Sequence, residues 1–117
     1  MSKLLIHGTK KLKGEVQIHG AKNSTLPLMA ASLLCGGECV LHNCPALSDV
    51  DTAIKILRHL GCKVERTAGD VVINPLPAEN YDIPDHLMRE MRSSIIFLGA
   101  IVSRLERAVL SFPGGCE

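Results

Sequence analysis

The alternation of apolar and polar residues predicts an alternating series of strands and helices. Period-two runs predict strands at Lys3–His7, Gly14–His19, Glu38–His42, Cys62–Thr67 and Asp70–Asn74. The last two are joined at Ala68-Gly69, which is typical of a hairpin turn. Helical spacing predicts one helix from about Ser24 to Cys35 and another from Ser48 to Leu60. The order from Gly14 to Asn74 is therefore β-α-β-α-β-β.

The two predicted helices differ in character. The first carries almost no charge from Leu26 to Leu34, and a helix that is apolar on every face is expected to be buried. Pro27 would lie in its first turn, and Gly36-Gly37 would end it. The second helix is amphipathic. We expect Ser48 to cap it, with Asp51 completing a weak capping box and Gly61 ending it.

The pattern starts again after this unit. A short strand at Asn80–Ile83 precedes a helix from Asp85 to about Arg104 that is also largely apolar, and a strand follows at Ala108–Phe112. One and a half copies of the unit would contain about eight strands and two buried helices. Little in the chain would cover these helices, so we expect missing repeats, a partner chain or self-association. The glycine-rich end, 111–117, resembles a loop cut before its next element.

Composition narrows the protein class. The 117 residues suffice for one small domain, and 46% of them are apolar. A net charge of +1 with scattered basic residues does not indicate nucleic acid or an anionic membrane as a partner. We find no signal peptide and no apolar run of membrane-spanning length. Five cysteines without a secretion signal indicate free thiols in a reducing cytoplasm.

The turn Gly20-Ala21-Lys22-Asn23 is the first candidate site. It joins a predicted strand to a predicted helix, where backbone N–H groups and the helix dipole favour a phosphate or carboxylate. Lys22 would add a positive charge, and Asn23 would add donors and an acceptor. The alternative is a turn glycine followed by a solvated lysine and a capping asparagine, because the spacing fits no established phosphate-binding motif.

Two further positions are able to carry chemistry. Cys116 follows two glycines in a loop, where a thiol is able to act as nucleophile or proton donor, although a bystander cysteine fits equally well. Arg89 and Arg92 are three residues apart and would share a helix face suited to an anion. A solvated face, or a salt bridge to Glu90 or Asp85, explains them equally well.

Other polar residues have structural explanations. The spacing of Cys35, Cys39, Cys44 and His42 fits no zinc template, and cysteine behaves as a small apolar residue in a strand, so we expect no metal site. Asp49 and Asp51 fall near a helix start, where the dipole favours carboxylates without any functional role.

Six short motifs together resemble one family. They are Gly14-Glu15-Val16, Gly20-Ala21-Lys22-Asn23, Leu47-Ser48-Asp49-Val50, Leu60-Gly61, Met91-Arg92-Ser93-Ser94 and Pro113-Gly114-Gly115-Cys116. In this order and spacing they resemble the UDP-N-acetylglucosamine 1-carboxyvinyltransferases, which move enolpyruvyl from phosphoenolpyruvate to the 3-hydroxyl of the sugar and release phosphate in peptidoglycan synthesis. The resemblance runs from about Lys3 to the last residue.

The resemblance implies a fold and a domain division. The family has an α/β fold, an inverse α/β barrel, in which six β-α-β-α-β-β repeats form two domains with helices inside and sheets outside. Residues 1–19 would pack with the second domain, and residues 20–117 would form part of the first. No metal or organic cofactor is implied. The substrates are phosphoenolpyruvate and UDP-N-acetylglucosamine, in the cytoplasm.

The resemblance also assigns residues. Lys22 and Asn23 match the pair that contacts phosphoenolpyruvate, and Arg92 matches an arginine for the nucleotide sugar. Cys116 matches the loop cysteine that acts as general acid and reacts with fosfomycin. The general base and further phosphate-binding arginines would lie beyond Glu117, so we expect this chain to be inactive without its second domain or another copy. The alternatives are the shikimate-pathway enolpyruvyl transferase, against which Cys116 and the Met-Arg-Ser stretch argue, and a non-catalytic self-associating module.

Overall fold

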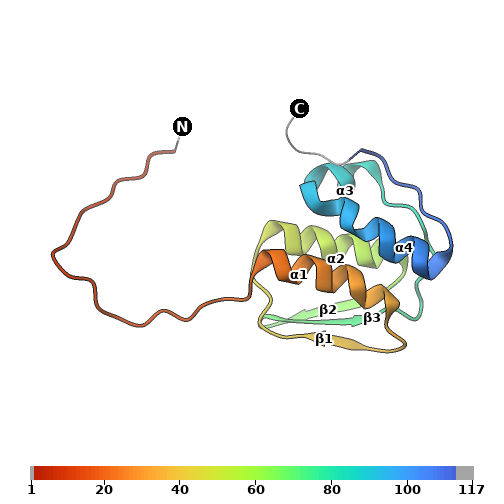
Figure 1. Ribbon diagram of the computed structural model, residues 1–117, viewed down its shortest axis with the longest axis horizontal. Coiled ribbons are helices and arrows are strands. Elements are labelled where there is room, and N and C mark those ends of the chain that lie inside the picture. Colours follow the sequence, from red (N-terminus) through yellow and green to blue (C-terminus); the bar gives the residue numbers. More distant parts are fainter. Residues whose placement is uncertain (1, 113–117) are drawn as a thin grey trace.

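A computed structural model describes residues 2–112 of the chain. The body is a small sheet with its first two helices on one face and the later helices beyond them, and the residues before it run away from it as an extended segment (Figure 1). The elements are α1 (Lys22–Ala31), the 3₁₀ turn η1 (Ser32–Leu34), β1 (Cys39–Leu41), α2 (Ser48–Leu60), β2 (Lys63–Thr67), β3 (Asp70–Asn74), α3 (Asp85–Glu90), the 3₁₀ turn η2 (Arg92–Ile96) and α4 (Phe97–Leu105).

The sheet confirms the predicted hairpin. Strand β3 lies in the centre and pairs antiparallel with both β1 and β2, giving the order β1-β3-β2. Val71 and Ile73 are fully buried beneath the helices, whereas Val72 between them is partly exposed, as the two-residue period of a strand requires. The sheet thus supplies one wall of the core.

Helix α2 supplies the opposite wall. Its apolar stripe is buried as predicted, with Val50, Ile56 and Leu57 at 0% exposure. Gly61 ends the helix with φ 108°, and the N–H of Cys62 then reaches the carbonyl of Leu57. The predicted Ser48 cap is wrong. Leu47 occupies the N-cap position, no side chain caps the helix, and the acidic side chains in the first turn face the dipole instead.

Helix α1 begins two residues earlier than predicted. Because it starts at Lys22, Pro27 lies beyond the first turn, contrary to the prediction. A proline there has no N–H to donate to the carbonyl of Asn23, so that carbonyl loses its usual helical partner. The hydroxyl of Thr25 donates to the carbonyl of Ala21 and helps to hold the first turn.

The third predicted helix is broken. Met91 is extended (φ −137°, ψ 118°) and separates α3 from η2 and α4. Its side chain is fully buried, and the hydroxyl of Ser94 donates to the carbonyl of Met88 across the break. Periodicity missed this interruption because apolar residues continue through it.

Most of the predicted outer strands are absent from residues 2–112. Lys3–His7 and Gly14–His19 form no strand, and their apolar side chains are exposed, with Leu4 at 87% and Val16 at 83%. A strand needs a neighbour for its backbone hydrogen bonds, and these segments have none here. The segments near Asp82 and Val109 do pair, but through a single parallel bridge. Of the seven strands predicted by residue range, three form within residues 2–112, two are reduced to this one bridge, and two do not form.

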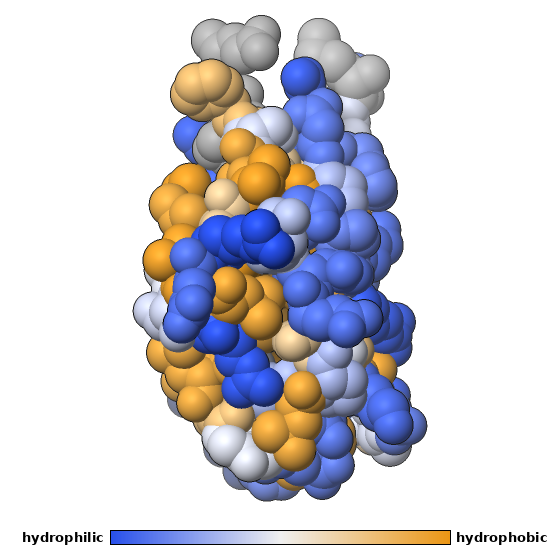
Figure 2. Space-filling model, turned by 90° about the vertical axis from the view of Figure 1, so that its right-hand side faces the viewer, coloured by the Kyte–Doolittle hydropathy of each residue, from blue (hydrophilic) through white to orange (hydrophobic). Residues whose placement is uncertain are grey.

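The apolar helices are buried on one side only. Leu28 and Leu34 on α1 and η1 are 54% and 56% exposed, and Leu98 and Val102 on α4 are 40% and 44% exposed. On the face that Figure 2 draws, apolar residues gather toward the left and polar residues toward the right. The prediction that these helices are buried all round is wrong for this chain, as the expected lack of covering elements already suggested.

Candidate functional site

The predicted anion-binding turn lies at the start of α1. Lys22 and Asn23 are the first two residues of the helix, both are exposed, and the N-cap residue Ala21 offers no side-chain cap. The partial positive charge of the helix N-terminus is therefore not offset by a capping side chain. Helix α2 packs against α1 and starts on the same side of the molecule (Figure 1).

A carboxylate from α2 holds the lysine. Lys22 Nζ lies 2.5 Å from Asp49 Oδ2, and the side chains are 44% and 18% exposed. We interpreted Asp49 as a dipole partner without a further role, and that interpretation missed this contact. The signal was present in the Leu47-Ser48-Asp49-Val50 motif, but only the packing of α1 on α2 shows which cation the carboxylate meets.

Gly20 fixes the chain immediately before the helix. A Cβ at Gly20 would lie 2.0 Å from the carbonyl oxygen of Asn43 and 3.2 Å from its carbon. These are backbone atoms of the turn between β1 and α2, so no side-chain movement relieves the clash. Only glycine permits this approach, and the approach sets where α1 starts.

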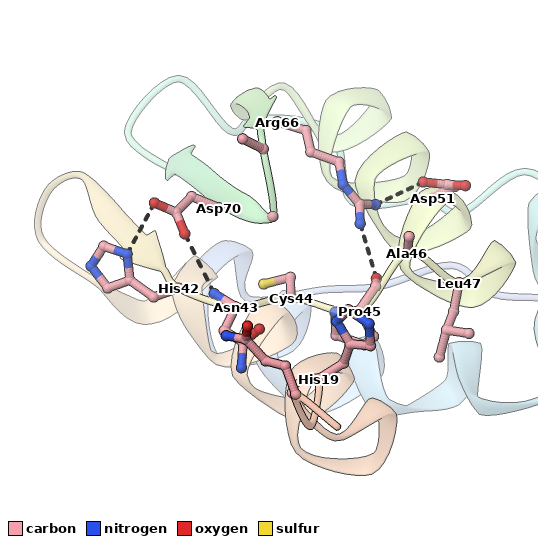
Figure 3. A pocket seen from close by; sticks show the side chains of 14 residues that line it. His19, His42, Asn43, Cys44, Pro45, Ala46, Leu47, Asp51, Arg66 and Asp70 are labelled. Atoms are coloured by element: carbon pink, nitrogen blue, oxygen red, sulfur yellow. Dashed lines mark hydrogen bonds and ion pairs between the residues drawn. The ribbon is translucent and has the colours of Figure 1, made fainter. Parts of the chain in front are cut away.

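A wide cleft lies beside this junction, not at Lys22. Its volume is about 1350 Å³, and it opens between the turn after β1, the β2–β3 hairpin and the end of the extended segment (Figure 3). Arg66 bonds to Asp51 at 2.9 Å and to the carbonyl of Pro45 at 2.9 Å. Asp70 accepts from the backbone of Asn43 and pairs with His42 at 3.1 Å. Neither Lys22, Asn23 nor Arg92 lines it.

Arg92 lies apart from Arg89. The break at Met91 means that the two arginines do not share one helix face, contrary to the prediction. Arg89 bonds to Asp85 at 2.8 Å within α3, which confirms the salt-bridge alternative for that residue. Arg92 is exposed as the first residue of η2, and η2 packs against α1. The helical elements that carry Lys22, Asn23 and Arg92 are therefore in contact.

Two carboxylates support the α2–α3 region. Bonding to Lys55 and then to Thr52 holds the pKa of Glu90 below its usual value and ties α2 to the end of α3. A hydrogen bond from Ser111, and then one from Arg89, lowers the pKa of Asp85. Both carboxylates are on the surface, so these contacts add little to the free energy of unfolding. Their main effect is to orient the helical elements that they join.

The remaining candidates are the loop cysteine Cys116 and the cysteines and histidine that we considered as a metal site. Cys116 lies outside the described residues. Within residues 2–112, no three His, Cys, Asp or Glu side chains gather in a way that would hold a metal ion. Cys44 and Cys62 are buried, and burial raises the pKa of each thiol, to about 11 for Cys62. The expectation of a metal-free protein stays a prediction.

No helix in the described part of the chain is long and apolar enough to cross a membrane.

Known proteins resemble this chain along its whole length. UDP-N-acetylglucosamine 1-carboxyvinyltransferase 2 of Caldanaerobacter subterraneus is 52% identical over 117 residues. The UDP-N-acetylglucosamine 1-carboxyvinyltransferase of Pseudothermotoga lettingae is 44% identical over 117 residues. In each case the match covers 100% of this chain and 28% of the relative. The chain thus spans little more than a quarter of the length of these relatives.

A solved structure and a family model lead to the same group of enzymes. The crystal structure of the enolpyruvyl transferase NikO from Streptomyces tendae matches with a TM-score of 0.74 and 25% identity, over 85% of this chain and 23% of that one. A family model described as EPSP synthase (3-phosphoshikimate 1-carboxyvinyltransferase) matches residues 6–117. The α/β fold class predicted from the sequence is confirmed as a partial α/β fold. The chain belongs to the EPSP synthase (3-phosphoshikimate 1-carboxyvinyltransferase) family.

Proposed function

We propose that the chain is the N-terminal portion of a UDP-N-acetylglucosamine 1-carboxyvinyltransferase. The whole enzyme would transfer enolpyruvyl from phosphoenolpyruvate to the 3-hydroxyl of the nucleotide sugar and release phosphate. The single observation that carries this proposal is the 52% identity to a transferase of that name over all 117 residues. The reaction would take place in the cytoplasm, where peptidoglycan precursors are made, and would need no cofactor.

The motifs distinguish this function from its nearest alternative. The matching family model is described by the name of the shikimate-pathway enzyme. The two relatives described above, however, are named for UDP-N-acetylglucosamine as their substrate. Met91-Arg92-Ser93-Ser94 and Cys116 are the residues whose motifs resemble those of the nucleotide-sugar enzymes. They favour UDP-N-acetylglucosamine over a shikimate as the acceptor.

Lys22 would act on the phosphate of phosphoenolpyruvate. Its ammonium lies at the uncapped N-terminus of α1, so the charge of the side chain and the dipole of the helix favour the same anion. As the phosphate becomes a leaving group, Lys22 would stabilise its growing charge. Asn23 would add amide hydrogen bonds, and Arg92 would bind the nucleotide sugar from η2.

Asp49 limits the freedom of Lys22. Because Asp49 is largely buried and pairs with Nζ, the ammonium is held near the first turn of α1 before any substrate arrives. A positioned cation loses less conformational entropy on binding than a free lysine does. Cys116 would supply the proton to the enol carbon, which makes the neighbouring carbon electrophilic toward the sugar hydroxyl.

The chain alone would hold only part of this site. It spans 28% of the length of its relatives, and we propose that the general base is contributed by the remainder of the enzyme. The extended and exposed residues 2–19 support the proposal that residues 1–19 pack with a second domain, because their apolar side chains lack a covering surface. A second domain would complete the site and cover this segment.

Phosphate release tests the proposal. The folded 117-residue chain should release no phosphate from phosphoenolpyruvate with or without UDP-N-acetylglucosamine. Adding the remaining polypeptide of a relative should give sugar-dependent release, which Lys22→Ala and Cys116→Ala should abolish. Lys55→Ala is the matched control, because Lys55 pairs with Glu90 on the surface. Release that depends on a shikimate acceptor instead, or that survives Lys22→Ala, would contradict the proposal.

A second candidate is a self-associating module without activity. The exposed apolar residues of α1, η1 and α4 favour it, because a soluble monomer rarely leaves such a surface uncovered. This function predicts an oligomer that releases no phosphate even after the remaining polypeptide is added.

A further inference from the structure

The β2–β3 hairpin holds the turn at residues 43–45, which follows β1. The carbonyl of Gly69 accepts a hydrogen bond from the N–H of Cys44 at 2.7 Å, and the carboxylate of Asp70 accepts one from the N–H of Asn43 at 3.4 Å. Asn43 has φ 56°, in the left-handed region that few residues other than glycine adopt. A residue persists there only where its surroundings fix it, so these contacts from the hairpin define the shape of the turn.

Arg66 on β2 makes a third contact with this turn. Its guanidinium donates to the carbonyl of Pro45 at 2.9 Å, Pro45 is buried, and the Arg66 side chain is 24% exposed (Figure 3). A hydrogen bond from a charged donor is stronger than one between neutral groups. The other partner of Arg66, the carboxylate of Asp51, is 62% exposed, and an ion pair open to solvent contributes little. Pro45 is therefore the partner through which Arg66 acts on the fold.

The same turn contacts the chain just before α1 and at the start of α2. Gly20, two residues before the start of α1, packs so closely on the carbonyl of Asn43 that no room is left for a Cβ. The carbonyl of Pro45 also accepts from the N–H of Leu47 at 3.0 Å, and Leu47 is the N-cap residue of α2. A displacement of the turn therefore shifts the beginning of each helix.

Lys22 and Asp49, which form the ion pair of the candidate site, each lie two residues beyond these contacts. Arg66 lines the cleft and Lys22 does not, so the guanidinium acts on the lysine from a distance. From this series of contacts we propose that Arg66 is a positioning residue, which keeps Lys22 in place for phosphoenolpyruvate by fixing the turn at residues 43–45. The proposal rests on the proposed transferase function, because it concerns how Lys22 is held for that reaction.

The kinetic consequence of losing Arg66 differs from that of a loss of stability. A displaced Lys22 weakens the interaction with phosphoenolpyruvate in every molecule, and a misplacement of about 1 Å is able to reduce a rate roughly a hundredfold. The nucleotide sugar should be affected less, since Arg92 is carried by η2. A chain that is merely less stable has fewer active molecules, which lowers kcat and leaves both KM values unchanged.

Steady-state kinetics tests the proposal on the complete transferase, made as this chain followed by the remaining polypeptide of a relative. Arg66→Met keeps the apolar stem of the side chain and removes its donors. We expect the KM for phosphoenolpyruvate to rise about tenfold and the KM for UDP-N-acetylglucosamine to stay within about twofold. Arg66→Lys should recover part of the loss, because an ammonium is still able to donate to the carbonyl of Pro45.

Asp51→Asn is the matched control, because it removes only the exposed partner of Arg66. This variant should have the same KM values as the parent enzyme. A fall in kcat at unchanged KM values in Arg66→Met would show a structural role and overturn the proposal. An Asp51→Asn variant as impaired as Arg66→Met would also overturn it, because Arg66 would then act through the surface ion pair.

Amide hydrogen exchange on the 117-residue chain gives a second measurement, which does not depend on catalysis. The N–H groups of Ser24 and Thr25 bond to the carbonyl of Ala21 in the first turn of α1. In Arg66→Met their exchange should become at least about tenfold faster, whereas the N–H of Cys62, bonded at the other end of α2, should keep its rate. Faster exchange of all three would report general destabilisation and would count against the proposal, as would unchanged rates at Ser24 and Thr25.

The two measurements separate this proposal from the proposed function. A complete parent enzyme that releases no phosphate with UDP-N-acetylglucosamine would contradict the transferase function and, with it, the role of Arg66 in catalysis. An active parent enzyme, together with unchanged KM values in Arg66→Met, would contradict the role of Arg66 alone.

Discussion

Lys22 Nζ lies 2.5 Å from Asp49 Oδ2, and this contact joins the first turn of α1 to the first turn of α2. Considered alone, each residue has a structural explanation: the lysine is a solvated cation, and the aspartate interacts favourably with the dipole of α2. Together they form a cation that is held in place beside a helix N-terminus.

Asp49→Asn should impair the complete transferase under the proposed function. Without the carboxylate the Lys22 ammonium is no longer held, so kcat/KM for phosphoenolpyruvate should fall about tenfold. Steady-state kinetics with phosphoenolpyruvate as the varied substrate measures this. Asp51→Asn is the matched control in the same helical turn, because Asp51 pairs with Arg66 instead. Equal values for the two variants would show that Asp49 does not position the lysine.

Gly20→Ala should destabilise the chain. The new methyl group would lie 2.0 Å from the Asn43 carbonyl oxygen, so the start of α1 or the turn after β1 must move. Overpacking of this kind costs about 1–3 kcal/mol in the free energy of unfolding, which urea denaturation measures. Gly14→Ala is the control, because a Cβ there contacts nothing within 4 Å. A Gly20→Ala variant as stable as Gly14→Ala would contradict the close approach.

Local patterns predicted the body of the fold well. The β2–β3 hairpin and the buried stripe of α2 follow from periods of two and 3.6 residues, which depend on neighbouring residues alone. The strands at Lys3–His7 and Gly14–His19 failed because a strand needs a pairing partner, and none is present in residues 2–112. The break at Met91 escaped prediction because burial of its side chain, a tertiary effect, overrides helical spacing.

The candidate site was predictable in part. Lys22 and Asn23 were identified because a glycine turn before a helix has a known physical use. Asp49 was missed, since its partner lies 27 positions earlier and only packing brings the two helices together. The pairing of Arg89 with Asp85 was open between two explanations, and the four-residue spacing on α3 decides it.

Cys62 should make the chain sensitive to alkali. Burial raises the pKa of its thiol from 9.0 to about 11, so the folded chain holds this proton more tightly than the unfolded chain does. The corresponding stability is complete below pH 9 and is lost as the pH rises toward 11. The free energy of unfolding should fall by roughly 2 kcal/mol across this window through Cys62, and Cys39 and Cys44 add to the fall.

Cys62→Ala measures that contribution. The variant loses packing at every pH, but its further loss between pH 9 and pH 11 should be smaller than that of the parent chain. Urea denaturation at pH 8 and pH 10.5 compares the two, and the cavity left by the substitution costs the same at both. Parallel losses in the variant and the parent would mean that the Cys62 thiol titrates as an exposed thiol does.

The exposed apolar side chains of α1 and α4 should drive self-association of the 117-residue chain. Leu28 and Leu98 are 54% and 40% exposed on helices that pack against each other, so two copies are able to cover these surfaces mutually. Sedimentation velocity over a range of concentrations should show an oligomer, and Leu28→Glu with Leu98→Glu should shift it toward monomer, by tenfold or more in the dissociation constant. Val109→Glu is the matched control, since Val109 is 58% exposed in the segment after α4. An oligomer that persists with both α1 and α4 charged, or that dissociates with Val109→Glu, would place the interface elsewhere. A chain that is monomeric at every concentration would show instead that these side chains tolerate water until the remaining polypeptide covers them.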